Sequence, residues 1–161
     1  MKRAERYAEA LDRLLELVVL LNDDMTRSLA RDGLTTSRAA VLWQLHHRGP
    51  LTQRELADAL QVTARTVTGL IDGLAGTGFV TRQPHPTDRR ATLVTFTEHG
   101  AATAQALQHA QDEFTGLLFD GMPDDRFDGL LAGLDDVLAR LRQAGLGGAP
   151  AGTPTGTEEE T

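Results

Sequence analysis

The sequence predicts a mainly α-helical protein that carries one small β-hairpin. Apolar residues at helical spacing dominate both ends of the 161-residue chain, and one stretch past the middle has the residues of two short strands. Glycine and proline residues separate these segments, as turn formers do. Between residues 51 and 96 the order is helix, helix, strand, loop and strand, which is the order of a helix-turn-helix with an attached β-wing.

The first helix of this motif has a clear start signal. Thr52 can cap the helix while the side chain of Glu55 reaches back to the amide of the cap residue. Gln61 and Val62 then form a brief turn before the second helix. An earlier helix is predicted from about Thr36 to His47, where a Gly-Pro pair stops it.

The second helix of the motif, from Thr63 to Ala75, is predicted to bury one side only. Its apolar side recurs at helical spacing and consists of Val67, Leu70, Ile71 and Leu74. The polar or small residues fall on other faces, among them Arg65, Thr66, Thr68, Gly69 and Gly73. Thr63 is a natural cap for this helix, and glycines at 76 and 78 end it. One side is therefore available to meet a ligand.

The hairpin follows directly. Phe79–Gln83 and Ala91–Phe96 are rich in β-branched and aromatic residues, and the loop between them is predicted to run from Pro84 to Arg90. Two prolines in the loop disfavour strand pairing and stiffen a projecting tip. That tip carries adjacent arginines, Arg89 and Arg90.

These segments together resemble a known family. The pattern comprises Thr52–Leu60, Thr63–Gly78, and Asp88-Arg89-Arg90 followed by Phe96-Thr97-Glu98-His99-Gly100. It is similar to the MarR family of winged-helix bacterial regulators, and the helix order agrees up to about Gln143. The Asp-x-Arg of the wing and the Thr-x-x-Gly downstream are the more specific parts of the resemblance.

The resemblance implies a function. Members are typically homodimers that bind pseudo-palindromic operators in double-stranded DNA, often repress, and often release DNA when a small, frequently aromatic, ligand binds. It also implies that Thr63 to Ala75 is the recognition helix, that Arg90 enters a minor groove, and that Asp88 holds the wing arginine. The chain departs from many relatives at Gly69 and Gly73, where basic residues are common.

The predicted DNA-binding residues lie on the motif and its wing, and each has a plainer interpretation as a cap or a solvated side chain. They are Arg54, Thr63, Arg65, Thr66, Thr68, Asp88, Arg89 and Arg90. Thr63 serves equally well as a helix cap, and Arg54 as a phosphate contact or a solvated residue. The proline-braced pair at the wing tip is the stronger prediction.

Net charge is the main objection to a nucleic-acid partner, because the chain carries a formal charge of −7. The charge is uneven: residues 1–32 have net −1, residues 33–100 net +2, and residues 101–161 net −8. A winged-helix module that binds protein instead of DNA therefore stays an alternative. A less favoured one is an unrecognised enzyme, since the sequence has no glycine-rich phosphate loop, nucleophile elbow or His-Glu-x-x-His pattern.

Apolar stripes at the two ends of the chain predict dimerisation helices. Between these stripes, a helix is predicted from about Thr97 to before Met122. The N-terminal stripe contains Leu11, Leu14, Leu15, Val18, Leu21, Met25 and Leu29, and the C-terminal one Phe127, Leu130, Leu131, Leu134, Val137, Leu138 and Leu141. The stripes alone fit a dimer and an intramolecular bundle equally, and the resemblance favours the dimer. The expected segments are 1–32 and 100–143 for dimerisation, 33–99 for DNA binding, and a disordered tail at 144–161.

Other sites are predicted with less support. A ligand cleft implied by the resemblance would be lined by Met25, Trp43, His47 and Phe114. The five histidines match no metal-ligand spacing, so neither a metal nor a cofactor is expected. With no cysteine, disulfides and thiol chemistry are excluded. No apolar run is long enough to span a bilayer and the N-terminus shows no secretory pattern, so we expect a cytoplasmic protein.

Overall fold

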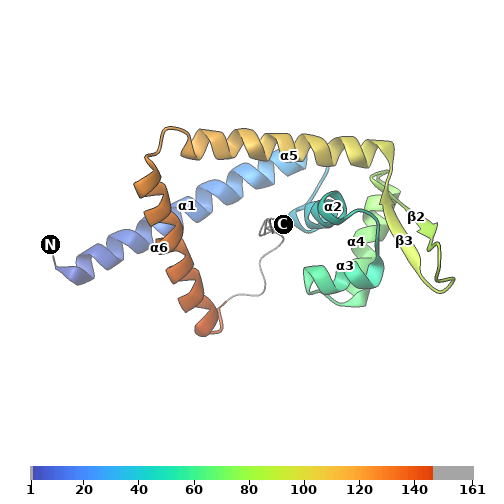
Figure 1. Ribbon diagram of the computed structural model, residues 1–161, viewed down its shortest axis with the longest axis horizontal. Helices are drawn as coiled ribbons and strands as arrows, with labels where there is room; N and C mark the ends of the chain where they lie inside the picture. Colours follow the sequence, from blue (N-terminus) through green and yellow to red (C-terminus); the bar gives the residue numbers. More distant parts are fainter. Residues whose placement is uncertain (1, 147–161) are drawn as a thin grey trace, which may run out of the picture. The chain divides into compact units, whose positions relative to one another are not determined.

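A computed structural model describes residues 2–146 (Figure 1). The elements, in chain order, are α1 (Arg3–Arg31), α2 (Thr36–Arg48), β1 (Leu51–Thr52), α3 (Gln53–Leu60), α4 (Ala64–Gly76), β2 (Val80–Pro84), β3 (Thr92–Phe96), α5 (Glu98–Phe119) and α6 (Asp124–Gln143). This mainly helical chain with a small antiparallel sheet confirms the predicted fold class. Beyond residue 146 the predicted tail lies outside the described residues.

The chain forms two compact units that meet in sequence between Ala40 and Val41. The first unit holds α1 and the start of α2. α1 ends in a turn at Gly33, where φ is +70° and the amide of Leu34 donates to the carbonyl of Leu29 at 2.9 Å. Most of its large apolar side chains are exposed, namely Tyr7, Leu11, Leu15, Leu17, Val18, Val19, Leu20 and Met25.

The second unit contains a three-stranded antiparallel sheet in the order β1-β3-β2. β1 was not predicted: Leu51 pairs with Val94 of β3, and a two-residue strand is too short to show an alternating pattern. The predicted loop start at Pro84 is also wrong, because Pro84 pairs with Thr92 as the last residue of β2. β2 is an edge strand, where a missing amide hydrogen is tolerated.

The core of this unit brings together α2, α3, α4 and β3. Its fully buried side chains are Val41, Leu42, Leu56, Val67, Ile71, Leu74 and Val94. Three of them, Val67, Ile71 and Leu74, belong to the apolar side predicted for the second helix of the motif. Burial of that side leaves the opposite side of α4 exposed.

The start of α5 is fastened to the connection between α4 and β2. The amide of Thr97 donates to the carbonyl of Phe79 at 3.1 Å, and its hydroxyl donates to the carbonyl of Gly78. The same hydroxyl accepts from the amide of Gly100 at 3.0 Å and so caps α5. Gly100 is buried against Phe79, so closely that any side chain there would meet the Phe79 carbonyl.

α5 and α6 carry many exposed apolar side chains at and beyond their junction. They are Leu117, Leu118, Phe119, Leu130, Leu131, Val137, Leu138 and Leu141. Phe119 and Phe127 contact each other edge to face, with ring centroids 5.3 Å apart. Of the helices that the structure describes, none has the length and apolar character needed to cross a membrane.

Candidate nucleic-acid interface

The capping box predicted for the first helix of the motif is present in α3. The amide of Thr52 donates to Oε2 of Glu55 at 2.8 Å, and the amide of Glu55 donates to the Thr52 hydroxyl at 3.2 Å. The Thr52 amide and hydroxyl hold the pKa of Glu55 below its ordinary value, and Arg48 and His85 lower it further. The start of α3 is therefore fixed by a charged group.

The turn between α3 and α4 is short, as predicted. Gln61 adopts the left-handed conformation with φ of 52°, and the amide of Val62 donates to the carbonyl of Ala57 at 3.0 Å. Thr63 then caps α4 by accepting from the amide of Thr66 at 3.1 Å. The hydroxyls of Thr63 and Thr66 also share a hydrogen bond of 2.9 Å. Two of the predicted DNA-binding residues thus order the start of α4.

The exposed side of α4 carries the residues predicted to meet a ligand. Arg65, Thr66, Thr68 and Asp72 are all exposed. The Thr68 hydroxyl donates to the carbonyl of Ala64 at 2.8 Å. It also accepts from the side-chain amide of Gln53 at 3.0 Å. The single hydroxyl proton of Thr68 is therefore already used in a hydrogen bond to the helix backbone.

That Gln53 contact belongs to a network that the sequence did not reveal. Nε of Arg82, in β2, donates to Oε1 of Gln53 at 3.1 Å, and its terminal nitrogen forms a 2.5 Å ion pair with Asp72 of α4. Thr68, Gln53, Arg82 and Asp72 therefore connect α4, α3 and the wing in one chain of polar contacts. Arg82 therefore has an internal partner on each side, Gln53 and Asp72.

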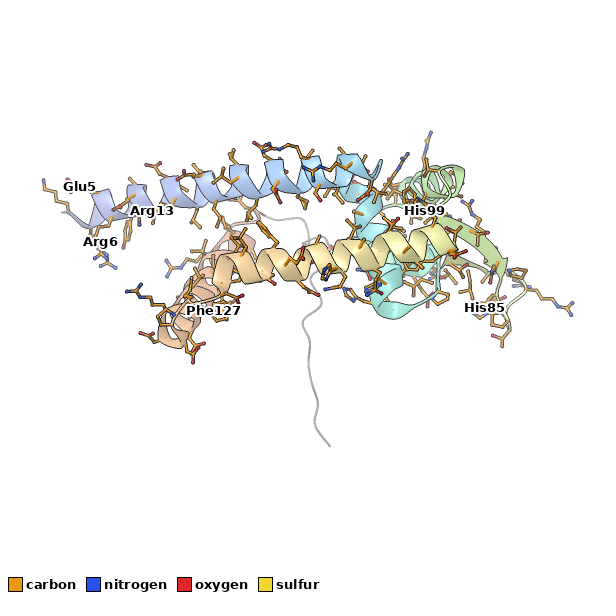
Figure 2. The ribbon with its side chains drawn as sticks, turned by 90° about the horizontal axis from the view of Figure 1, so that it is seen from above. Glu5, Arg6, Arg13, His85, His99 and Phe127 are labelled. Atoms are coloured by element: carbon orange, nitrogen blue, oxygen red, sulfur yellow. The ribbon has the colours of Figure 1, made fainter. Side chains whose placement is uncertain are left out.

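The wing loop runs from His85 to Ala91. The amide of His85 donates to the carbonyl of Ala91 at 3.2 Å, which closes the loop. Oδ1 of Asp88 accepts from the backbone amide of Arg90 at 2.9 Å. Asp88 thus holds the backbone of the wing arginine. Figure 2 shows His85 in this loop, at the hairpin end of the sheet.

Arginine side chains are exposed on both parts of the surface. Arg54 of α3, Arg65 of α4, and Arg89 and Arg90 of the wing form no ion pair with any residue in the described range 2–146. Arg82, by contrast, is neutralised by Asp72. The exposed side of α4 and the wing lie in the one compact unit, so two separate cationic points are available to a single partner.

The predicted ligand-binding residues are only partly brought together. Trp43 and His47 stack at the end of α2 with ring centroids 5.3 Å apart and an angle of 17° between the planes. Phe114 is half-buried on α5, and Met25 is exposed on α1 in the other compact unit. The ligand cleft therefore stays a prediction.

The remaining histidines have individual surroundings. His46 lies beside His47, His99 packs on Phe79 with ring centroids 4.8 Å apart, and Nε2 of His109 lies 3.4 Å from Glu113. Within the part of the chain that the structure describes, no three potential ligand side chains gather in a way that could hold a metal ion.

Comparisons with known proteins agree with this geometry. Residues 34–92 match the model of the MarR family. The chain is 31% identical over 151 residues to the HTH-type transcriptional repressor YetL of Bacillus subtilis, covering 87% of this chain and 89% of that protein. It is 31% identical to the regulator MhqR of the same organism, covering 76% and 72%.

Solved structures give the same assignment. A MarR family regulator from Neisseria meningitidis superposes with a TM-score of 0.57 at 29% identity, covering 84% of this chain and 95% of that one. The matched segment 34–92 contains the capped helices, the exposed side of α4 and the wing tip. The chain belongs to the MarR family of transcriptional regulators.

Proposed function

We propose that this protein is a sequence-specific, dimeric, DNA-binding transcription regulator that acts as a repressor. The observation that carries the proposal is the pairing of an exposed side of α4, which bears Arg65, with a wing tip that bears Arg89 and Arg90; none of the three has a carboxylate partner among the described residues. A helix of this kind fits the major groove, while a basic wing fits the adjacent minor groove. The similarity to transcriptional repressors agrees with this use.

The residues divide into positioning and reading roles. Arg65 and Thr66 stand at the exposed start of α4, where recognition helices contact base edges. Arg54 supplies a phosphate contact from α3, and Thr63 serves as the cap. Arg89 and Arg90 supply the wing contacts, with Asp88 fixing the backbone between them. Thr68 belongs to the same surface, but its hydroxyl is hydrogen-bonded to Gln53 and to the carbonyl of Ala64. It contributes to DNA recognition mainly by holding α4 in place.

Dimer formation is proposed on the exposed apolar side chains of the terminal helices. Val18 is 62% exposed in α1, and Leu117 is 79% exposed in α5. Apolar surface on this scale is costly to leave in water, and a second copy of the chain would cover it. A symmetric dimer would present two copies of α4 to successive major grooves, about 34–36 Å apart. Such a regulator acts in the cytoplasm, where its operator lies.

Release by a small, possibly aromatic ligand is the regulatory part of the proposal. The stacked rings of Trp43 and His47 offer one flat aromatic surface. Met25 and Phe114 belong to this proposal on the family resemblance alone. A thermal-shift series with phenolic compounds tests this part, because a ligand that binds only the folded protein raises its melting temperature. Variants of Trp43 should lose that shift.

The DNA-binding claim is tested with a duplex that the full-length protein selects from a random pool. Arg90→Ala should weaken binding and flatten the plot of log K against log salt by about one unit if a phosphate contact is lost. Arg65→Ala should instead change the selected sequence, at a cost of about 1–3 kcal/mol for a lost base contact. Arg126→Ala, an exposed arginine on α6, is the matched control and should change neither.

Sedimentation of the same preparation tests the assembly. A protein that selects no duplex at low ionic strength contradicts the proposal, and so does a chain that sediments as a monomer. The first result would favour a winged-helix module that binds protein.

A further inference from the structure

His85 occupies an unusual place in the wing. Its Nδ1 accepts hydrogen bonds from the backbone amides of Asp88 at 3.0 Å and Thr87 at 3.2 Å, and the Thr87 hydroxyl lies 3.4 Å away. The imidazole is half-buried, whereas the other loop residues from 86 to 90 are exposed. One ring nitrogen therefore organises the turn that leads into the two wing arginines.

This contact starts a short series of bonds that ends at the arginines. His85 fixes the amide of Asp88, and Oδ1 of Asp88 fixes the amide of Arg90. The carbonyl of Asp88 in turn accepts from the amide of Ala91 at 3.1 Å, which leads the chain back into β3. Because each bond orders the residue that makes the next one, loss of the first loosens the base of the tip.

The bonding pattern requires a particular state of the ring. An imidazole nitrogen accepts hydrogen bonds only when it carries no proton, so the ring is neutral with its proton on Nε2. In the charged imidazolium both nitrogens are donors, and Nδ1–H would face two N–H groups. We infer that His85 is the positioning residue of the wing, and that its neutral imidazole orders the turn carrying Arg89 and Arg90 for DNA binding.

The charged groups that face the ring are Glu55 of α3 and Asp88 of the loop itself. Glu55, at the start of α3, is near enough for a positive charge on His85 to lower the pKa of its carboxyl, after the larger effects of Thr52 and Arg48. Asp88 is the acidic group of the loop itself, and its Oδ1 is already occupied by the amide of Arg90.

This role of His85 rests on the proposed contact between the wing and DNA. Two variants, His85→Asn and His85→Ala, distinguish the effect of the hydrogen-bond acceptor from that of the imidazole ring. The asparagine Oδ1 replaces Nδ1 as an acceptor but does not titrate, whereas alanine has no acceptor. At about pH 7.5 and about 0.15 M salt, His85→Ala should weaken binding to the selected duplex by about 2- to 10-fold, as expected for one net hydrogen bond. His85→Asn should stay within about twofold of the wild type.

Lowering the pH supplies a second readout. When the ring takes up a proton as the pH falls, wild-type binding should decrease by about 2- to 10-fold more than that of His85→Asn, because only the wild type loses its acceptor. His109→Asn removes a titrating histidine on α5 and should keep the wild-type pH profile. Equal pH profiles for wild type and His85→Asn would overturn the inference. Equal losses for His85→Asn and His85→Ala would do the same.

A measurement without DNA distinguishes this inference from the proposed function. In the nitrogen–proton NMR spectrum of the full-length protein, the amide signals of Thr87 and Asp88 should move together with the titration of the His85 ring. They should not move with pH in His85→Asn. If the amide signals of Thr87 and Asp88 do not change with the titration of the ring, the inference is wrong, whatever the DNA-binding results are. If these signals change with the ring while Arg90→Ala binds DNA as the wild type does, His85 orders the turn as inferred, and the proposed contact between the wing and DNA is wrong.

Discussion

Gly100 offers a sharp test of how the start of α5 is joined to the winged-helix body. A Cβ atom at this position would lie 1.8 Å from the carbonyl oxygen of Phe79 and 3.1 Å from Cδ1 of Phe96. Real Cβ atoms essentially never approach within 3.0 Å, so Gly100→Ala requires the two backbones to separate by roughly 1.2 Å. The Phe79 oxygen also accepts from the Thr97 amide, so that bond is strained as well.

The expected cost follows from these contacts. Overpacking of this kind costs about 1–3 kcal/mol, and a disturbed hydrogen bond adds about 1 kcal/mol. The higher helix propensity of alanine returns at most about 1 kcal/mol. Gly100→Ala should therefore lower the free energy of unfolding by about 1–3 kcal/mol, or the melting temperature by about 2–12 °C for a chain of this size.

Thermal and urea unfolding followed by circular dichroism measure this change. Gly69→Ala is the matched control, because Gly69 is also helical but has no atom within 4 Å of a Cβ built there. It should stabilise the protein by about 0.5–1 kcal/mol. If Gly100→Ala proves as stable as Gly69→Ala, the close approach of α5 to Phe79 does not exist in solution.

Two further predictions concern the motif itself. Thr52→Ala should destabilise the protein by about 1 kcal/mol through loss of the α3 cap. Because the folded state holds the pKa of Glu55 below its ordinary value, the stability contributed by its carboxylate is complete above that ordinary value and lost as pH falls through the lowered one. If Thr52→Ala lowers the free energy of unfolding by the same amount below and above this pH range, the charge of Glu55 does not contribute to the cap. Asp72→Asn should free Arg82 to contact a phosphate. The slope of log K against log salt for DNA binding should then become steeper by up to about 0.9. The double variant with Arg82→Ala should return the slope to its original value. A slope that stays steep in the double variant would exclude Arg82 as the source of the change.

Local patterns in the sequence were sufficient for the helical part of the motif. The helix predicted from Thr63 to Ala75 is observed as Ala64–Gly76, and the capping box of Thr52 and Glu55 was predicted with both of its bonds. Both features depend on residues within one or two helical turns, where side-chain chemistry and spacing decide the structure. The exposed placement of Arg65 follows from the same spacing.

Longer-range contacts were not predictable in this way. Arg82 meets Asp72 ten residues away and Gln53 twenty-nine residues away, and only the folded sheet brings them together. The strand β1 was missed because its pairing with β3 leaves no pattern in two residues. His85 is different: its acceptor role spans three residues, between two prolines and ahead of Asp88, and that local arrangement of a turn was a usable signal.

The joint between α5 and the body has a mechanical consequence. The amide and the hydroxyl of Thr97 donate to the carbonyls of Phe79 and Gly78, between the end of α4 and β2, and the amide of Gly100 donates to the same hydroxyl. The start of the 22-residue helix α5 is thereby joined to the backbone that connects α4 to the wing strand β2. A tilt of α5 at this joint would therefore displace the connection between α4 and β2, and a molecule bound along α5 would act on both elements without contacting them.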